Sequence, residues 1–493
     1  MSQGRECSQP VTRCCRWRVV GRNRHTRPGP VWSPGLQLHI SARWGRDSLF
    51  SSEEVGRGDR AKRPWPRRLM SGEANLISCG MPWRVHRAER RAMSRDRRLL
   101  ATPLADGGYP YAANPVWQER LRDGDVSAGQ LWDLAARLPL LGRREPIGGV
   151  DMVEVGFLTQ GGVGQEVLLH VNSLTDNVRH SFEPWLMEPV PHTPLHTLDL
   201  WLPADGCYSY RFVAMRHVPR DAGATPEGWR AVHANGRPDP RNPERIVDPL
   251  GQFSSVWRGP DAMSPTGSGA AVDWEGDVVD CPDGESRPVW FRRGSEGDRL
   301  PLLVLFDGEL WRSPGVVERL GEPRLKAMDV VLIDARSPRD RWRDLTSRGW
   351  GDQVRVVLEQ VLPHLRRATD DPEQVILAGQ SLGGLAAARL ALGPDRVADR
   401  ALCQSGSFWW RDGAKDPGRP GRLIEELVDI EASGSQFVVQ VGIDEQEMVE
   451  RSREFTAAAR AAGAQVRHHE WRGGHDYAWW REGLVSGVTD LLG

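Results

Sequence analysis

The sequence predicts an α/β fold, a mostly parallel sheet with helices on both faces, preceded by a β-sandwich domain. Two patterns along the chain indicate this. Residues 150–258 contain short alternating segments interrupted by Gly, Pro and Asn, which is typical of the strands and turns of a sandwich. Further along, β-branched segments alternate with helical ones, and this alternation indicates a parallel sheet. The predicted strands of that sheet are 302–306, 329–334, 375–378, 402–404, 437–441 and 465–471.

The third of these strands leads into Gly379-Gln380-Ser381-Leu382-Gly383, and an Ala-rich segment follows at once. Strand, tight turn and helix together form the nucleophile elbow of an α/β-hydrolase, which exposes the serine hydroxyl above the sheet. Glycine is needed on both sides because side chains there would collide in the strained turn. Ser381 is therefore the predicted nucleophile. The alternative is an ordinary strand-to-helix loop in which the serine caps the helix.

A serine hydroxyl needs a base, and the base needs an orienting carboxylate. In α/β-hydrolases the acid follows the nucleophile along the chain, and the histidine follows the acid. His475 is the predicted base because it lies on a Gly-Gly loop between the last predicted strand and the C-terminal helix. His468 and His469 lie within that strand, and we interpret both as part of a solvated strand face.

The acid is expected just after the strand 437–441. Three carboxylates compete there, on Asp444, Glu445 and Glu447. Each of them could instead be the acidic first turn of the next helix, which is predicted to run to about Ala462, because negative charge is favourable at a helix N-terminus. Periodicity does not choose among the three.

Two backbone N–H groups are needed to stabilise a tetrahedral oxyanion. The residue after the nucleophile, Leu382, supplies one of them. The other is expected from the loop after an early strand, which here reads Asp307-Gly308-Glu309. We expect Glu309 to donate it, or Gly308 if Glu309 does not.

Four motifs stand along the chain in this order: FDGELW (306–311), VVLIDA with the RWRDL that follows it (to 345), VILAGQSLGG running on to CQSGSFWW (375–410), and GGHDYAWWR (473–481). In these motifs and their order the chain resembles the enterochelin (ferric enterobactin) esterases, within the wider group of esterase D-like α/β-hydrolases. The resemblance implies Ser381 as nucleophile and His475 as base, and it selects Glu445 as the acid. Segments between Glu166 and Pro243 look like the family's N-terminal β-sandwich. One departure is Asp344, which stands where the family usually has Glu.

The resemblance implies a serine esterase that hydrolyses the trilactone backbone of a ferric catecholate siderophore. Iron would enter only as part of that substrate, with no cofactor and no metal held by the protein. A large aromatic anion calls for arginines and aromatic walls, so the expected substrate-binding residues are Arg341, Asp307, Trp311 and Trp480. For each tryptophan, core packing is at least as good an interpretation. For Arg341, a salt bridge to Asp344 at a helix start is an equal alternative.

Two other functions remain open at this point. One is a different esterase of the same group, a feruloyl or acetyl esterase or an acyltransferase, which would use the same triad. The other is a catalytically silent siderophore-binding protein, against which the intact Ser, Glu and His argue.

The charge of the chain is uneven, and this sets the predicted domain boundaries. Residues 1–100 hold 22 Lys+Arg against 8 Asp+Glu, with no sustained periodicity. We interpret them as a disordered or non-native extension and not as a nucleic-acid-binding arm, since a recognisable motif is missing; the part before Met93 is expected to be dispensable. An N-terminal helical segment and the sandwich are predicted for 101–258, a linker for 259–272 and the esterase domain for 273–493.

Composition also bounds the location and the partners. No apolar run approaches the roughly 18 residues of a membrane span, and no signal segment opens the chain. Cys207, Cys281 and Cys403 are odd in number and far apart, which favours reduced thiols and a cytoplasmic protein. The expected partner is a small-molecule siderophore, with no nucleic acid and no membrane; the oligomeric state is not predicted.

Overall fold

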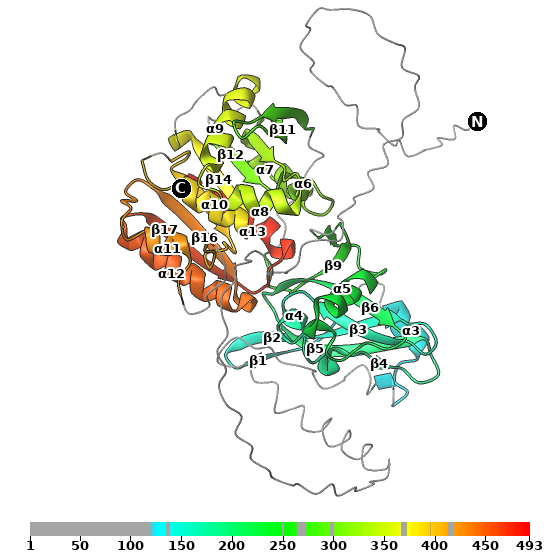
Figure 1. Ribbon diagram of the computed structural model, residues 1–493. Coiled ribbons are helices and arrows are strands. Elements are labelled where there is room, and N and C mark those ends of the chain that lie inside the picture. The colour runs from blue at the N-terminus through cyan, green and yellow to red at the C-terminus, as the bar shows by residue number, and fades with distance from the viewer. Residues whose placement is uncertain are drawn as a thin grey trace, which may run out of the picture.

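The structure, a computed structural model, contains two sheet-based bodies joined side by side (Figure 1). The basic segment 1–100 and most of the predicted linker lie outside the described residues. The structure describes residues 120–493, apart from 122, 135–138, 249–250, 264–272, 296–299, 366–371, 395 and 413–418.

The N-terminal body contains two antiparallel sheets. The first has the order β1-β2-β5-β4 and the second the order β3-β6-β9-β8, with β7 paired to β6. Side chains from β2, β3, β5 and β6 form one apolar core, as expected for two sheets packed face to face. The strands are β1 (Leu140–Ile147), β2 (Val150–Gln160), β3 (Glu166–Val171), β4 (Glu188–Pro189), β5 (Leu195–Pro203), β6 (Cys207–Met215), β7 (Gly236–Arg237), β8 (Arg245–Val247) and β9 (Phe253–Arg258).

Helices are short in this body. They are α3 (Ala128–Leu134), α4 (Leu174–Asn177) and α5 (Pro226–Asn235), with 3₁₀ turns at Glu183–Trp185 and Ala222–Ala224. The pattern from Val126 to Leu141 predicts one or two amphipathic helices, and this is correct only for α3. Leu140 already begins β1, and Pro139 before it could not continue a helix.

The C-terminal body is an eight-stranded sheet in the order β10-β11-β13-β12-β14-β15-β16-β17. From β13 onward in this order the neighbours are parallel. The α/β fold class is thereby confirmed; the antiparallel hairpin of β10 and β11 at one edge was not predicted. The strands are β10 (Glu275–Asp280), β11 (Ser286–Arg292), β12 (Leu302–Phe306), β13 (Val330–Ile333), β14 (Val375–Gln380), β15 (Arg400–Gln404), β16 (Gln436–Gly442) and β17 (Gln465–Trp471).

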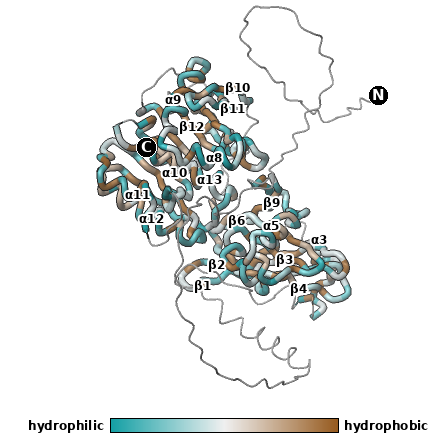
Figure 2. Tube along the Cα trace, in the orientation of Figure 1, coloured by the Kyte–Doolittle hydropathy of each residue, from teal (hydrophilic) through white to brown (hydrophobic). Residues whose placement is uncertain are grey.

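Helices cover both faces of this sheet. Along β12, Leu302, Val304 and Phe306 enter one apolar cluster, and Leu303 and Leu305 enter the other. Strands buried on both faces are therefore apolar throughout, which Figure 2 shows as brown central strands. The helices are α6 (Gly308–Trp311), α7 (Pro323–Ala327), α8 (Pro338–Thr346), α9 (Trp350–Val361), α10 (Leu382–Leu390), α11 (Arg422–Glu426), α12 (Glu447–Ala461) and α13 (Tyr477–Leu492); 3₁₀ turns lie at Val317–Gly321, Leu362–His364, Pro372–Gln374 and Ile443–Glu445.

A buried ion-pair network joins the two bodies. Glu482 of α13 accepts from Arg258 of β9 and from Arg319, each at 2.9 Å. Arg258 also binds Glu244 at 2.9 Å, and Glu244 in turn pairs with Arg481. Charges buried in this way are stable only while every partner is present, so the network holds the sandwich in one position on α13. In the part of the chain that the structure describes, no helix has the length and apolarity needed to cross a membrane.

The glycine before the nucleophile allows the elbow to close. A Cβ on Gly379 would lie 2.5 Å from the carbonyl oxygen of Gly383, and backbone cannot move aside as a flexible side chain can. We therefore expect Gly379→Ala to lower the free energy of unfolding by about 1–3 kcal/mol, the range of an overpacked core. Urea denaturation measures it. Gly129→Ala in α3, where a Cβ meets only a serine hydroxyl at 4.0 Å, is the control, and equal losses in both variants would contradict this account.

Candidate active site

Ser381 occupies the strained turn between β14 and α10. Its backbone has φ 56° and ψ −118°, a conformation that non-glycine residues adopt only at a cost of order 1–3 kcal/mol. Its N–H donates to Gln404 O at 3.0 Å, which ties the turn to the neighbouring strand β15. The sequence therefore placed the elbow correctly, with the hydroxyl at the carboxyl end of the sheet.

The acid and base meet although they come from different loops. Glu445 lies in the 3₁₀ turn after β16, and His475 lies in the loop after β17. Glu445 Oε2 is 2.6 Å from His475 Nδ1. The other carboxylate oxygen, Oε1, accepts from Gly442 N at 2.8 Å and from Ser405 Oγ at 2.5 Å. Both oxygens are thus engaged, and the carboxylate is held in one orientation.

The other two carboxylates near this loop point elsewhere. Asp444 accepts from the Tyr208 hydroxyl at 2.8 Å, and Glu447 in the first turn of α12 lies 3.7 Å from Arg451. Geometry therefore brings Glu445 to the histidine, as the family resemblance implies. Its role as the acid stays a prediction.

His475 is oriented for a reaction at its outer nitrogen. With Nδ1 bound to Glu445, the lone pair of Nε2 is left for a proton from a hydroxyl. The side chain is 40% exposed, and its ring packs edge-on against Trp480 with centroids 4.7 Å apart. In this conformation Ser381 Oγ hydrogen-bonds Ser407 Oγ at 3.2 Å. Within the described part of the chain, no hydrogen bond joins Ser381 to His475. Such bonds are often long before substrate binds.

The two predicted oxyanion donors lie at helix starts. Leu382 is the first residue of α10, and Glu309 is the second of α6. N–H groups in a first helical turn have no intrahelical acceptor, so they are available to an anion. Asp307 before α6 has a left-handed backbone with φ 59°, which turns the chain sharply after β12. Donation to an oxyanion stays a prediction for both residues.

In the salt-bridge alternative, Asp344 was the expected partner of Arg341, and the structure shows Asp307 in its place; contact of Arg341 with the substrate stays a prediction. Arg341 makes two bonds of 2.7 Å to Asp307 and a longer one to Gln380 O at 3.4 Å, while Asp344 is bound by Arg287 and Arg343. Asp307 itself is 2% exposed. Both oxygens of its carboxylate therefore bond to Arg341 inside the protein. Through Gln380 O, the pair also contacts the residue before the nucleophile.

Trp311 and Trp480 also face inward and do not form an open substrate wall. Trp311 is fully buried, and its Nε1 donates to Gln380 Oε1 at 3.1 Å. Trp480 is 4% exposed and donates to Ser405 Oγ at 2.9 Å. Core packing, the alternative interpretation for both, is what the structure shows, because large aromatic side chains with a polar nitrogen find an internal partner when buried.

Two serines of the site were missed in the sequence. Ser405 and Ser407 lie after β15, in the CQSGSFWW segment, where no spacing rule indicates a role. Ser405 has a positive φ of 46° and lies between the Trp480 indole and the Glu445 carboxylate. Ser407 contacts the nucleophile. Their position just after a predicted strand could have indicated them, since the carboxyl ends of parallel strands meet at one edge of the sheet.

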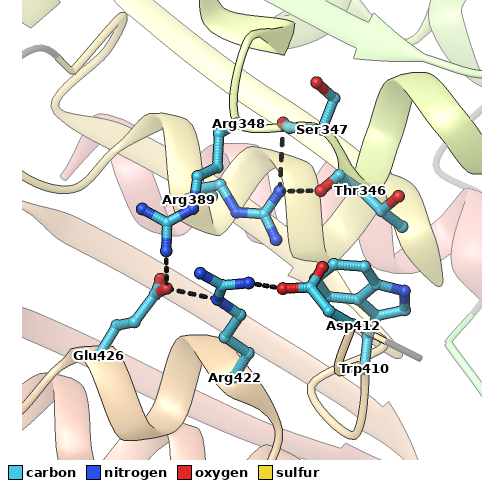
Figure 3. Close-up of a pocket in the computed structure, with 8 residues that line it drawn as sticks. All are labelled: Thr346, Ser347, Arg348, Arg389, Trp410, Asp412, Arg422 and Glu426. Atoms are coloured by element: carbon cyan, nitrogen blue, oxygen red, sulfur yellow. Dashed lines mark hydrogen bonds and ion pairs between the residues drawn. The ribbon is translucent and has the colours of Figure 1, made fainter. Parts of the chain in front are cut away.

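A cavity of about 240 Å³ lies among α8, α10, α11 and the segment between β15 and α11 (Figure 3). Its charges are largely paired with one another: Arg422 with Asp412 and Glu426, and Arg348 with Glu426. Arg389 donates instead to the carbonyls of Thr346 and Ser347, at 2.8 and 3.3 Å, which completes the C-terminus of α8. The cavity is therefore an ion-paired joint between helices, and none of the three predicted triad residues lines it.

Three potential metal ligands gather in the sandwich, His170, Asp176 and His233, with ligand atoms within 4.8 Å of one another. Two of these residues already bind each other, since His170 Nε2 is 2.9 Å from Asp176 Oδ1. Arg211 lies 3.1 Å from His233 Nδ1; because arginine only donates, the proton of a neutral His233 is on Nε2. Hydrogen bonding explains this cluster, and the expectation of no resident metal stays a prediction.

The comparisons with known proteins cover both bodies. A family model described as "Enterochelin esterase, N-terminal" matches residues 155–267, and one described as "Putative esterase" matches 284–491. The chain is 28% identical to the iron(III) enterobactin esterase of Escherichia coli over 378 residues, which are 69% of this chain and 92% of the relative. It is 27% identical to the iron(III) salmochelin esterase of Escherichia coli over 380 residues, 70% and 89% of the two chains. An enterobactin esterase structure from Shigella flexneri, solved in the presence of enterobactin, superposes with a TM-score of 0.63 at 25% identity and covers 74% of this chain and 99% of its own.

Glu309 gives the site a testable pH dependence. Burial, together with the charge of Asp307, raises the pKa of the Glu309 carboxyl to about 8. The group is therefore neutral near pH 7 and becomes negative as the pH rises past 8, beside the predicted oxyanion donors. We expect kcat to fall by about tenfold between about pH 7 and about pH 10, since a like charge nearby costs ~1–2 kcal/mol. A pH profile of kcat measures this.

Glu309→Gln should remove that fall, because the amide stays neutral at every pH tested. The exposed Glu318→Gln is the control and should keep it. A fall that persists unchanged in Glu309→Gln would show that another group titrates.

Proposed function

This chain belongs to the enterochelin esterase family and is an ester hydrolase, and we propose that its substrate is a ferric catecholate siderophore. The observation that most favours an enzyme over a protein that only binds the siderophore is the 2.6 Å contact between Glu445 and His475, in a chain whose Ser381 occupies a strained elbow. A protein that only bound the siderophore would have no use for this arrangement.

The proposed reaction gives each of these residues one role. His475 Nε2 accepts the proton of Ser381 as its oxygen attacks an ester carbonyl, while Glu445 stabilises the imidazolium that forms. The N–H groups of Leu382 and Glu309 stabilise the tetrahedral oxyanion. The ester bond then breaks, and His475 returns the proton to the leaving hydroxyl. Water repeats these steps on the acyl-enzyme and frees the serine.

The substrate assignment is supported by the relatives. Those named iron(III) enterobactin and salmochelin esterases match across both bodies of this chain. Opening a trilactone ring removes the preorganisation of its three catechol arms, so the iron is held less tightly. Iron enters as part of the substrate, and the proposed chemistry needs no other metal or cofactor.

We further propose that the reaction takes place in the cytoplasm. Cys207, Cys281 and Cys403 are buried and unpaired, and thiols of this kind suit a reducing compartment.

The test is product analysis after incubation with ferric enterobactin and, separately, with a simple aryl ester. We expect ring-opened catechol-serine products from the wild type, and loss of both activities in Ser381→Ala. Adding His475→Ala should cost little more, because the two residues act as one unit. Hydrolysis of the aryl ester alone would mean a different esterase; hydrolysis of neither would favour a binding protein. Additive losses in the double variant would contradict the shared role of serine and histidine.

A further inference from the structure

Ser173, a residue of the sandwich, has a strained backbone and touches the loop of the proposed base. It has φ 63° and ψ −43°, and Leu174 N donates across it to Asn172 O at 2.8 Å. This is a γ-turn of the rare, strained kind. Strain of this type persists only where surrounding contacts hold it, and it clusters at functional sites.

The surrounding contacts of Ser173 are well defined. Asp176 Oδ2 accepts from Ser173 N at 2.6 Å, and Asp176 Oδ1 is held in turn by His170. The hydroxyl of Ser173 is thereby aimed across the interface, where it accepts from His475 N at 2.9 Å. A side chain at Gly474 would collide with this hydroxyl, so the close approach depends on glycine there.

A second contact reaches the loop of the proposed acid. The Tyr208 hydroxyl on β6 donates to Asp444 Oδ2 at 2.8 Å, in a buried setting. Asn177 Nδ2 donates to the backbone carbonyl of the same Asp444 at 2.9 Å. Asp444 directly precedes Glu445, so the sandwich holds the backbone from which the acid projects.

We propose that Tyr208 and Ser173 are positioning residues that set the acid loop and the base loop relative to each other. Glu445 and His475 follow different strands, and their separation depends on how both loops are anchored. The sandwich contacts both loops, so it fixes the distance between Glu445 and His475. This inference rests on the proposed triad, and neither residue touches the reacting atoms.

Loss of this positioning should affect the chemical step of the reaction and not substrate binding. A small misplacement of the acid or base leaves substrate binding in place but slows proton transfer, and shifts of about 1 Å can cost up to ~100-fold in rate. We therefore expect kcat to fall while KM stays nearly constant. A simple aryl ester is the substrate of choice, because the test then does not depend on which siderophore is natural.

Tyr208→Phe has a closely matched control on the same strand. The Tyr210 hydroxyl is equally buried and also donates to a carboxylate, Asp239 Oδ2, at 2.8 Å, but this bond stays inside the sandwich. The Tyr210 hydroxyl also accepts from Asn242 Nδ2 at 3.2 Å, so both Phe variants remove buried hydrogen bonding and both melting temperatures should fall. We expect kcat to fall by about tenfold in Tyr208→Phe only, with KM unchanged.

Ser173→Ala tests the base loop, with Thr175→Val as its control. Thr175 Oγ1 accepts from Val171 N at 2.9 Å within the sandwich and has no role at the interface in this account. The rate at which a phosphonate ester labels Ser381 should fall in Ser173→Ala, because the labelling also needs the histidine, and it should stay at the wild-type value in Thr175→Val.

Equal kcat and labelling rates in each variant and its control would overturn the positioning role and leave an ordinary structural contact. So would a change in KM alone. If the wild type cleaved the aryl ester but not the siderophore, the proposed substrate would fail while these comparisons stayed valid.

Discussion

The buried carboxylate of Glu445 is the interaction on which the rest of the site depends. A carboxylate on a side chain that is only 1% exposed is stable only if its oxygens are bonded, and here three donors from three segments converge on it. Gly442 contributes a backbone N–H, Ser405 a hydroxyl, and His475 its ring. The end of β15, the end of β16 and the loop after β17 must therefore lie side by side, as the parallel strand order places them.

A second polar layer lies beneath the site. Gln380 donates to Gln404 at 2.9 Å, and Gln404 donates to Gln440 at 2.8 Å, so buried amides link β14, β15 and β16. The Asp307–Arg341 pair adds a link from β12 to α8. Fully satisfied buried networks of this kind rigidify the groups around them. Rigidity matters here because Ser381 keeps a backbone conformation that it would leave if its neighbours relaxed.

The fold and the strand-turn-helix elbow could be predicted from the sequence because they follow local rules. The elbow has its own glycine spacing, and strands buried on both faces are continuous apolar runs, so Ser381 and the central sheet were predictable. Choosing Glu445 over Asp444 was not possible from periodicity, since one residue along a 3₁₀ turn redirects the side chain. The roles of Ser405 and Tyr208 could not be predicted for a different reason. Their hydrogen-bond partners lie 40 and 236 residues away in the sequence, and no local sequence pattern indicates such contacts. The sequence also did not settle whether Trp311 packs in the core or which carboxylate Arg341 binds, because proximity in sequence to a site does not say which way a side chain points.

The most direct test of the account is the kcat of Glu445→Gln on an aryl ester, compared with Glu447→Gln. The amide keeps the size of the side chain but cannot stabilise the imidazolium of His475, and it favours the wrong tautomer. We predict a loss of roughly 10⁴-fold for Glu445→Gln, as for the acid of other triads. Glu447→Gln, two residues along on the first turn of α12, should stay within about twofold of the wild type. A Glu445→Gln enzyme with near wild-type kcat, correctly folded, would contradict the central role given to this carboxylate.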